Sequence, residues 1–362
     1  MRDLRISITM SLIVLISIGV MMIYSSSGIY ALQELGDDKY FLKRHTLFLL
    51  LGTICMTLAM AVDYRDLRKY AKPCILISFF LLVAVLVPGI GRESNGARRW
   101  FWLGPFNFQP SEFAKIAMLI YASDFLARKQ NKIKNFKEGF LPLMLILGPL
   151  CLLIVKQPDL GSSVSIAVIV LIMMFVAGAR LRHLGFLILS ALPVVYFLIA
   201  RVPYRMARIM AFLDPWEDSL GIGFQLSQSQ IALGSGRLLG VGLGKSVQKL
   251  FYLPAAHTDF ILSIIGEELG FLGAFAVIAL FIFFVWQAAR IAKRTTDPFG
   301  YFLSTGIVAM IGLQAVVNIG VSIGALPTKG LPLPFISYGG SALVFNMIAV
   351  GLLLNVSRTN DQ

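Results

Sequence analysis

Long apolar stretches alternate with short polar connections along the chain, and this pattern predicts its architecture. A transmembrane helix needs about 20 consecutive, mainly apolar residues, and ten stretches meet or approach that length. We therefore predict an all-α polytopic membrane protein with about ten transmembrane helices, in one integral membrane domain over residues 1–362. The predicted spans are 8–31, 45–62, 74–90, 111–127, 140–156, 161–178, 184–200, 259–289, 299–324 and 341–357.

Two places decide the number of spans. Between the fifth and sixth spans, Lys156-Gln157-Pro158-Asp159 interrupts the apolar run. Pro158 cannot continue a helix, so a tight turn is predicted there, whereas one continuous span would leave nine. At the N-terminus, Arg2 and Arg5 precede an apolar run, as in a secretory signal. That run is longer than a signal core and no A-x-A-like cleavage site follows it, so it is predicted to be the first span.

Composition agrees with a membrane protein and excludes other classes. Of the 362 residues, 57% are hydrophobic and 14% charged, with a mean hydropathy of +0.79, whereas a soluble domain carries about 25% charged residues. The net charge of +13 is explained by the Lys and Arg excess of cytoplasmic loops, so nucleic-acid binding is excluded. Cys55, Cys74 and Cys151 fall within apolar stretches, without metal-ligand spacing or a loop position suited to disulfides.

The distribution of positive charge predicts the orientation. If both termini share one side, that side carries seventeen Lys and Arg residues and the shorter loops opposite carry eight. Because Lys and Arg in short loops stay in the cytoplasm, both termini are predicted to be cytoplasmic. The extracytoplasmic face then carries loop 91–110, the long loop 201–258 between spans seven and eight, and the Pro-rich loop 325–340 between spans nine and ten. We expect the chemistry on that face.

The first candidate site lies at the start of the fourth span. Glu112 and Lys115, three residues apart, share one face of that helix. An ionisable pair there is costly unless it faces a polar cavity; the alternative is a local salt bridge. Upstream, Arg98 and Arg99 stand beside Trp and Phe residues, where they would bind a phosphate next to an apolar lipid portion.

The second candidate site lies where the long loop enters the eighth span. Thr258 can cap that helix, and Asp259 would then lie in its first turn, where the helix dipole favours a carboxylate. Capping and dipole stabilisation are one interpretation of this pattern. In the other, Asp259 accepts a proton from a sugar hydroxyl at the membrane surface, and His257 orients it.

Three further patterns surround this site. Glu267 and Glu268 lie about 12 Å further along the helix, and their side chains point in different directions around it. One of them is therefore expected to contact a neighbouring helix and the other to join the polar site, but the sequence does not decide which residue has which role. Segment 240–246 resembles a phosphate-binding loop, but Leu239 stands where that motif requires glycine, which indicates flexible loop turns. Polar residues over 225–230 indicate an amphipathic helix on the membrane surface.

Loop 325–340 is mostly apolar and contains three prolines. Irregular backbone at membrane depth is tolerated only where protein buries it or where it lines a cavity. This favours a cavity-lining loop over a plain tight connector. Lys329 and Ser337 are its candidate substrate-binding residues.

Several separated motifs follow one another along nearly the whole chain. They are Tyr24-Ser25-Ser26-Ser27, Arg98-Arg99-Trp100, Gln109-Pro110-Ser111-Glu112 with Lys115, Gly223-Phe224-Gln225 with Gln228-Ser229, His257-Thr258-Asp259-Phe260, Gly266-Glu267-Glu268-Leu269-Gly270 and 334–341. Together they resemble the FtsW/RodA/SpoVE family of shape, elongation, division and sporulation (SEDS) proteins. Segments 244–250, 254–257 and 326–330 look more like the division branch, FtsW, than the elongation branch, RodA.

The resemblance implies a ten-span peptidoglycan glycosyltransferase of the bacterial cytoplasmic (inner) membrane. It would polymerise lipid II on the outer face during cell division, together with a class B penicillin-binding protein that crosslinks the product and with other divisome membrane proteins. By similarity, Asp259 matches the family's essential acid, and Glu112 and Lys115 match other functionally important positions. These three are the predicted catalytic residues.

We hypothesise that Asp259 is the general base for attack of a sugar hydroxyl on an anomeric carbon while polyprenyl pyrophosphate departs. Lys115, with Arg98 or Arg99, would balance the pyrophosphate charge, Glu112 would position Lys115, and Lys329 would be a further phosphate ligand. No cofactor or metal site is specified. A divalent cation such as Mg²⁺ or Mn²⁺ would assist the leaving group, although the sequence contains no recognisable ligand cluster for one.

Other functions fit parts of the pattern. A lipid II flippase would use intramembrane charges such as Lys115 and Glu267 as a headgroup path, but the candidate residues gather on the outer side and the inner loops are only short and basic. A scaffold that recruits division proteins is compatible with the enzyme and predicts that site variants keep their biological function. The elongation-type paralogue is the remaining alternative.

Overall fold

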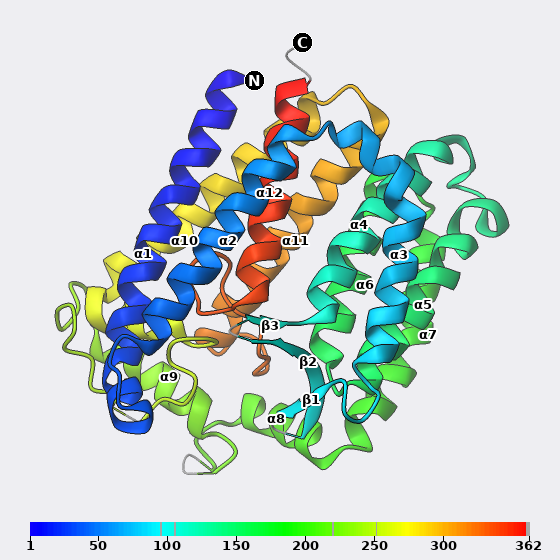
Figure 1. Ribbon diagram of the computed structural model, residues 1–362. Coiled ribbons are helices and arrows are strands. Elements are labelled where there is room, and N and C mark those ends of the chain that lie inside the picture. Colours follow the sequence, from blue (N-terminus) through cyan, green and yellow to red (C-terminus); the bar gives the residue numbers. More distant parts are fainter. Residues whose placement is uncertain (95, 105, 219–220, 251, 360–362) are drawn as a thin grey trace.

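The computed structural model describes residues 1–94, 96–104, 106–218, 221–250 and 252–359. It is a bundle of long helices with both termini at the same end, which we call the terminus end (Figure 1). Every predicted span overlaps a helix, and the all-α class is confirmed. These helices are α1 (Arg2–Leu35), α2 (Tyr40–Ala61), α3 (Leu67–Ala84), α4 (Pro110–Arg128), α5 (Leu141–Lys156), α6 (Leu160–Val176), α7 (Leu181–Ala200), α10 (Ile261–Arg294), α11 (Pro298–Ser322) and α12 (Ser341–Thr359).

Seven described helices are both long and apolar enough to cross a membrane, and α6 is apolar but shorter. The count of ten spans stays a prediction. The predicted turn at Pro158 is confirmed, since α5 and α6 end and begin around it. The third span differs most from its prediction, because its helix contains Pro73 and already ends at Ala84. The short helix Tyr64–Asp66 connects α2 with α3, and the short helices Gln130–Lys132 and Phe136–Phe140 connect α4 with α5.

The opposite end of the bundle carries the irregular segments, and we call it the sheet end (Figure 1). Loop 91–110, of which Asn95 and Pro105 lie outside the described residues, folds there into an antiparallel sheet. Its strands are β1 (Arg92–Ser94), β2 (Ala97–Leu103) and β3 (Phe106–Phe108). Two shorter helices from the long loop, α8 (Pro203–Leu213) and α9 (Phe224–Ser235), lie at the same end. The pattern did not predict these strands because such short strands show too little alternation.

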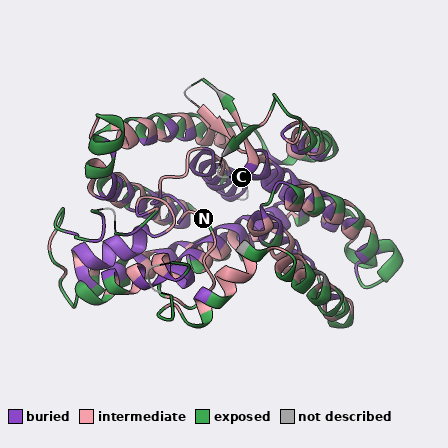
Figure 2. Cartoon of the chain, turned by 90° about the horizontal axis from the view of Figure 1, so that it is seen from below, coloured by how far each residue is buried: buried purple, intermediate pink, exposed green. Residues whose placement is uncertain are grey.

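Buried residues follow the central helices, whereas the peripheral helices are exposed on much of their surface (Figure 2). Nearly every described residue of α12 is buried, and this helix packs along α2. Large apolar side chains such as Phe80, Leu189 and Tyr196 are exposed on the periphery. Such a surface is the one expected to contact lipid chains in a multi-pass membrane protein.

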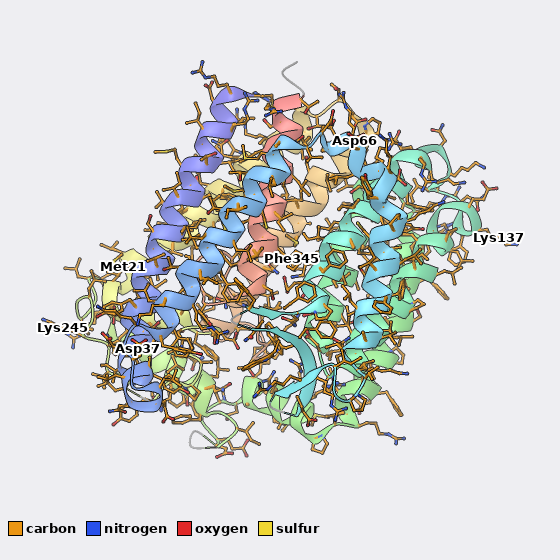
Figure 3. All side chains as sticks on the ribbon, in the orientation of Figure 1. Met21, Asp37, Asp66, Lys137, Lys245 and Phe345 are labelled. Carbon is orange, nitrogen blue, oxygen red and sulfur yellow. The ribbon has the colours of Figure 1, made fainter. Side chains whose placement is uncertain are left out.

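Aromatic rings join the sheet to the bundle. Phe345 of α12 lies beside β3 (Figure 3), with its ring centroid 6.0 Å from Phe108 and 6.2 Å from Phe113 of α4. Phe48 of α2 and Phe106 of β3 meet edge to face at 5.6 Å. These contacts hold the hairpin at the start of α4, where Glu112 and Lys115 lie.

A break in α10 explains the glycine-rich segment 240–246. Gly270 has φ 69° and ψ −171°, which interrupts the helix, and a Cβ on this residue would lie 2.3 Å from Gly240 N. The peptide groups around the break pair with segment 237–242: Phe271 N with Arg237 O (2.8 Å), Leu272 N with Leu238 O (3.2 Å), Val241 N with Glu267 O (3.0 Å) and Gly242 N with Glu268 O (3.1 Å). Gly240 therefore serves close backbone packing against α10, and the predicted loop turns over 240–246 are present.

The predicted helix over 225–230 is present as α9, but it packs against protein. Ser227 and Ser229 are buried, the Ser229 hydroxyl lies 2.6 Å from Ser263 Oγ of α10, and it donates to Ser322 O of α11 (2.8 Å). The Ser229 hydroxyl thus joins α9 to α10 and α11 inside the bundle.

Candidate functional site

Asp259 lies in a turn ahead of α10. This helix begins at Ile261, and the Thr258 hydroxyl donates to Ala255 O (3.1 Å) instead of capping it. The carbonyl of Ala255, a residue with φ 57°, also accepts the amide hydrogen of Asp259. The predicted cap by Thr258 is therefore wrong, because this tight turn carries Asp259 outside the helix.

Asn318 and Gly330 bring the Pro-rich loop to Asp259. Asn318 Nδ2 of α11 donates to Asp259 O (2.8 Å) and to Leu331 O (2.8 Å), and so ties the turn to the loop. A Cβ on Gly330 would lie 3.1 Å from Asp259 Oδ2, and Gly330 is exposed. The carboxylate thus faces a residue without a side chain. We had not singled out Asn318, although an amide inside an apolar span is itself a signal.

The half-buried Asp259 carboxyl has a shifted acidity. Desolvation raises its pKa to about 6, and the Arg208 guanidinium of α8 opposes this rise. Arg208 Nη1 also donates to Thr328 O of the Pro-rich loop (3.3 Å). A carboxylate with this pKa is ionised at neutral pH and still basic enough to take up a proton.

Lys329 reaches from the same loop to the start of α6. Its Nζ donates to Ser165 Oγ (3.0 Å), and a Cβ on Gly161 would lie 2.3 Å from its Cε. Burial lowers the pKa of Lys329 to about 8; Asp159 opposes this effect and Lys115 adds to it. Lys329 therefore stands between the Asp259 turn and the charged residues at the starts of α4 and α6.

Glu112 and Lys115 form a closed pair at the start of α4. Lys115 Nζ donates to both carboxylate oxygens of Glu112 at 2.9 Å, and the two side chains are 5% and 2% exposed. The alternative of a local salt bridge is therefore present in the structure. The charge of Lys115 also acts on Lys329 of the Pro-rich loop, whose pKa it lowers.

Arg98 and Arg99 have partners of their own. Arg98 Nε lies 3.3 Å from Glu93 on the hairpin, and both side chains are exposed. Arg99 donates to the carbonyls of Gln157 and Pro158, in the turn between α5 and α6. Arg99 thus fixes this turn to the sheet.

His257 and Ser337 support the backbone around the site. The His257 ring lies among the rings of Tyr30, Phe41 and Tyr338, at centroid distances of 5.9, 4.5 and 6.0 Å, and burial lowers its pKa to about 4. Ser337 Oγ accepts from Leu333 N (2.9 Å). These contacts favour anchoring of the loop and of the turn.

Glu267 and Glu268 both bind the long loop. Glu267 accepts from the Ser246 hydroxyl and from Val247 N (2.9 Å). Glu268 accepts from Lys249 Nζ (2.8 Å) and from Ser25 Oγ of α1 (2.7 Å). Both carboxylates therefore hold segment 246–249 against the break in α10. Glu268 thus contacts the neighbouring helix α1, as expected for one of the two, whereas the hydrogen bonds of Glu267 go to segment 246–248.

No group of three His, Cys, Asp or Glu side chains in the described part of the chain is arranged to hold a metal ion. The charge that acts on Asp259 is that of Arg208, and Lys329 stands beside Gly330, the loop residue that faces the Asp259 carboxylate.

Residues 5–362 match the family model FTSW_RODA_SPOVE, described as a cell cycle protein. The chain is 49% identical over 339 residues to the probable peptidoglycan glycosyltransferase FtsW of Geobacter sulfurreducens, covering 94% of this chain and 91% of that protein. It is 46% identical over 346 residues to the stage V sporulation protein E of Bacillus subtilis, covering 96% and 94%.

Solved structures show the same fold. The rod shape determining protein RodA of Thermus thermophilus is similar with a TM-score of 0.73 and 29% identity, over 98% of this chain and 97% of that one. A chain from a study of how a peptidoglycan synthase complex coordinates polymerization and crosslinking has a TM-score of 0.78 and 30% identity, over 97% and 98%.

Proposed function

This chain belongs to the FtsW/RodA/SpoVE family, and from this premise we infer that it is a peptidoglycan glycosyltransferase of the division branch that polymerises lipid II. The observation that carries the chemistry is the half-buried Asp259 carboxylate, with a pKa of about 6, beside Arg208 of α8 and the Pro-rich loop that carries Lys329. Relatives named peptidoglycan glycosyltransferase FtsW at up to 49% identity support the division branch.

The reaction joins two lipid-linked disaccharides. A hydroxyl of one sugar attacks the anomeric carbon of the other, and a new C–O bond forms. The C–O bond to the pyrophosphate breaks, its electron pair stays on the pyrophosphate oxygen, and the hydroxyl proton passes to Asp259. A general base is needed for this transfer, and cations stabilise the charge that develops on the leaving group.

The protein is a multi-pass protein of the bacterial inner membrane, and we place its terminus end in the cytoplasm. The short connections at this end carry most of the basic residues, among them Lys137 (Figure 3). Asp259 and the Pro-rich loop then face the periplasmic side. A class B penicillin-binding protein is the proposed partner, and the similarity to a chain studied in a peptidoglycan synthase complex supports it.

Reconstitution separates the enzyme from a flippase. The purified protein, with its proposed partner, is expected to convert fluorescent lipid II into glycan polymer in proteoliposomes. The matched control is the same preparation carrying Asp259→Asn. Translocation of the lipid II headgroup without any polymer would overturn the assignment.

The pH dependence of polymerisation is expected to be bell-shaped. Asp259 must be deprotonated to act as a base, so kcat/KM falls as the pH drops through about 6. Lys329 must be protonated to bind phosphate, so kcat/KM also falls as the pH rises through about 8. Initial rates at subsaturating lipid II between pH 4.5 and 10 measure both limbs.

A matched variant assigns the alkaline limb. Lys329→Arg keeps the positive charge at every pH of the assay, and the alkaline limb is expected to disappear. An alkaline limb that persists unchanged in this variant would assign it to another group.

A further inference from the structure

Three of the four positive charges that the sequence suggested for the pyrophosphate, all except Lys329, are paired with other groups. Lys115 forms a salt bridge with Glu112 and is almost fully buried. Arg99 donates to two backbone carbonyls, and Arg98 pairs with Glu93 on the exposed hairpin. A departing pyrophosphate needs cations close to the reacting carbon, so other residues have to supply most of this charge.

Arg208 meets this requirement from α8. Its Nη1 donates to Thr328 O (3.3 Å), and its charge acts on Asp259. Lys329 is the next residue of the loop, and Gly330 after it faces Asp259 Oδ2. Three consecutive loop residues therefore connect Arg208, Lys329 and the proposed base.

The two cations approach the loop from different sides. Arg208 comes from α8, whereas Lys329 Nζ is directed to Ser165 at the start of α6. Asp159 lies close enough to Lys329 to favour its charged form. In a displacement reaction the leaving group departs from the face of the anomeric carbon opposite the attacking hydroxyl, so its ligands must lie across that carbon from the base. Gly330 is exposed and carries no side chain beside Asp259 Oδ2, so the reacting sugar can lie there, between the base and the two cations.

We propose that Arg208 binds the pyrophosphate of the donor lipid together with Lys329, across the reacting carbon from the position where Asp259 accepts the proton. This inference rests on the glycosyltransferase function proposed above. The guanidinium presents several donors in a planar fork that matches phosphate oxygens. Lys329 adds a point charge held in place by Ser165.

The direct test is binding of polyprenyl pyrophosphate, the reaction product. In an Asp259→Asn background, which prevents turnover, Arg208→Ala is expected to weaken this binding about ten- to hundredfold, as for the loss of a hydrogen bond to a charged group. Arg208→Lys is expected to recover part of the affinity. Polyprenyl monophosphate, with one phosphate fewer, should be much less sensitive to both substitutions.

Arg201→Ala is the matched control. It removes the same charge from an exposed arginine near α8 that lies over the Phe197 ring (4.4 Å), and it is expected to leave the affinity unchanged. Equal affinity of the Arg208→Ala and Arg201→Ala proteins for polyprenyl pyrophosphate would overturn the proposal.

Kinetics separates phosphate binding from mere positioning of the base. In the active protein, Arg208→Ala should raise the KM for lipid II and the inhibition constant of polyprenyl pyrophosphate together. If Arg208 acts only on Asp259, the acid limb of the pH profile moves upward while both constants stay the same, and the proposal fails. Arg208-dependent binding in a protein that makes no polymer would instead refute the glycosyltransferase function and leave the binding site standing.

Discussion

Asp259→Asn is expected to lower the rate of glycan polymerisation by about 10²–10⁴-fold, the usual contribution of a general base. The amide has the shape of the carboxyl group but cannot take up the hydroxyl proton. The backbone carbonyl of residue 259, which Asn318 binds, is unchanged by the substitution. The measurement is the initial rate of polymer formation from lipid II by the purified variant with its partner.

An exposed carboxylate at the same end of the bundle supplies the control for this variant. Asp37 pairs with Lys43 at 2.8 Å (Figure 3 labels Asp37), and Asp37→Asn is expected to retain activity within a factor of about two, as for a surface ion pair of small energy. Expression and partner binding should be normal in both variants. An Asp259→Asn protein that polymerises lipid II within a few-fold of the native rate would exclude Asp259 as the base.

Lys115→Met is expected to destabilise the protein by about 3–5 kcal/mol, because it leaves the Glu112 carboxylate buried without its charge partner. The side chains of this pair are 2% and 5% exposed. The double variant Glu112→Gln/Lys115→Met is expected to recover most of the lost stability, since it buries no uncompensated charge. The stabilities of the native protein, Lys115→Met and the double variant are compared by thermal unfolding in detergent, with size-exclusion chromatography as the readout.

The activity of that double variant distinguishes the two interpretations of the pair. If Glu112 and Lys115 belong to the site beside Lys329, polymerisation stays below about a tenth of the native rate even where stability has returned, as for the loss of a charged transition-state contact. Full recovery of the rate would make the pair a structural salt bridge. Lys69→Met, which opens the exposed Lys69–Asp66 pair (2.7 Å), is the control for loss of an ion pair.

The helices could be predicted because their signal is local. In a membrane, each helix satisfies its own backbone hydrogen bonds, so an apolar run of sufficient length suffices to identify it. The same locality explains the failures. The sheet of residues 92–108 is stabilised by cross-strand bonds and aromatic contacts with α2 and α12. The break at Gly270 depends on backbone pairing with segment 237–242.

The candidate site was predictable only in part. Position and charge singled out Asp259 and the pair of Glu112 and Lys115, which the family resemblance then matched to functionally important positions, and Lys329 was a candidate of the Pro-rich loop. The neighbouring aromatic residues suggested Arg98 and Arg99 as phosphate ligands, because a free and a paired arginine look alike in a sequence. Their partners, Glu93 and the carbonyls at 157 and 158, became known only with the fold.

The sequence by itself determined the membrane class, the positions of the long helices and the presence of an acid where the long loop meets α10. Only the tertiary structure decided what that acid can do. Asn318, Gly330 and Arg208 lie 59, 71 and 51 positions from Asp259 in the chain, and they reach it through helix packing and loop geometry. A carboxyl group acquires its pKa from desolvation and from the charges around it, and both are properties of the folded chain.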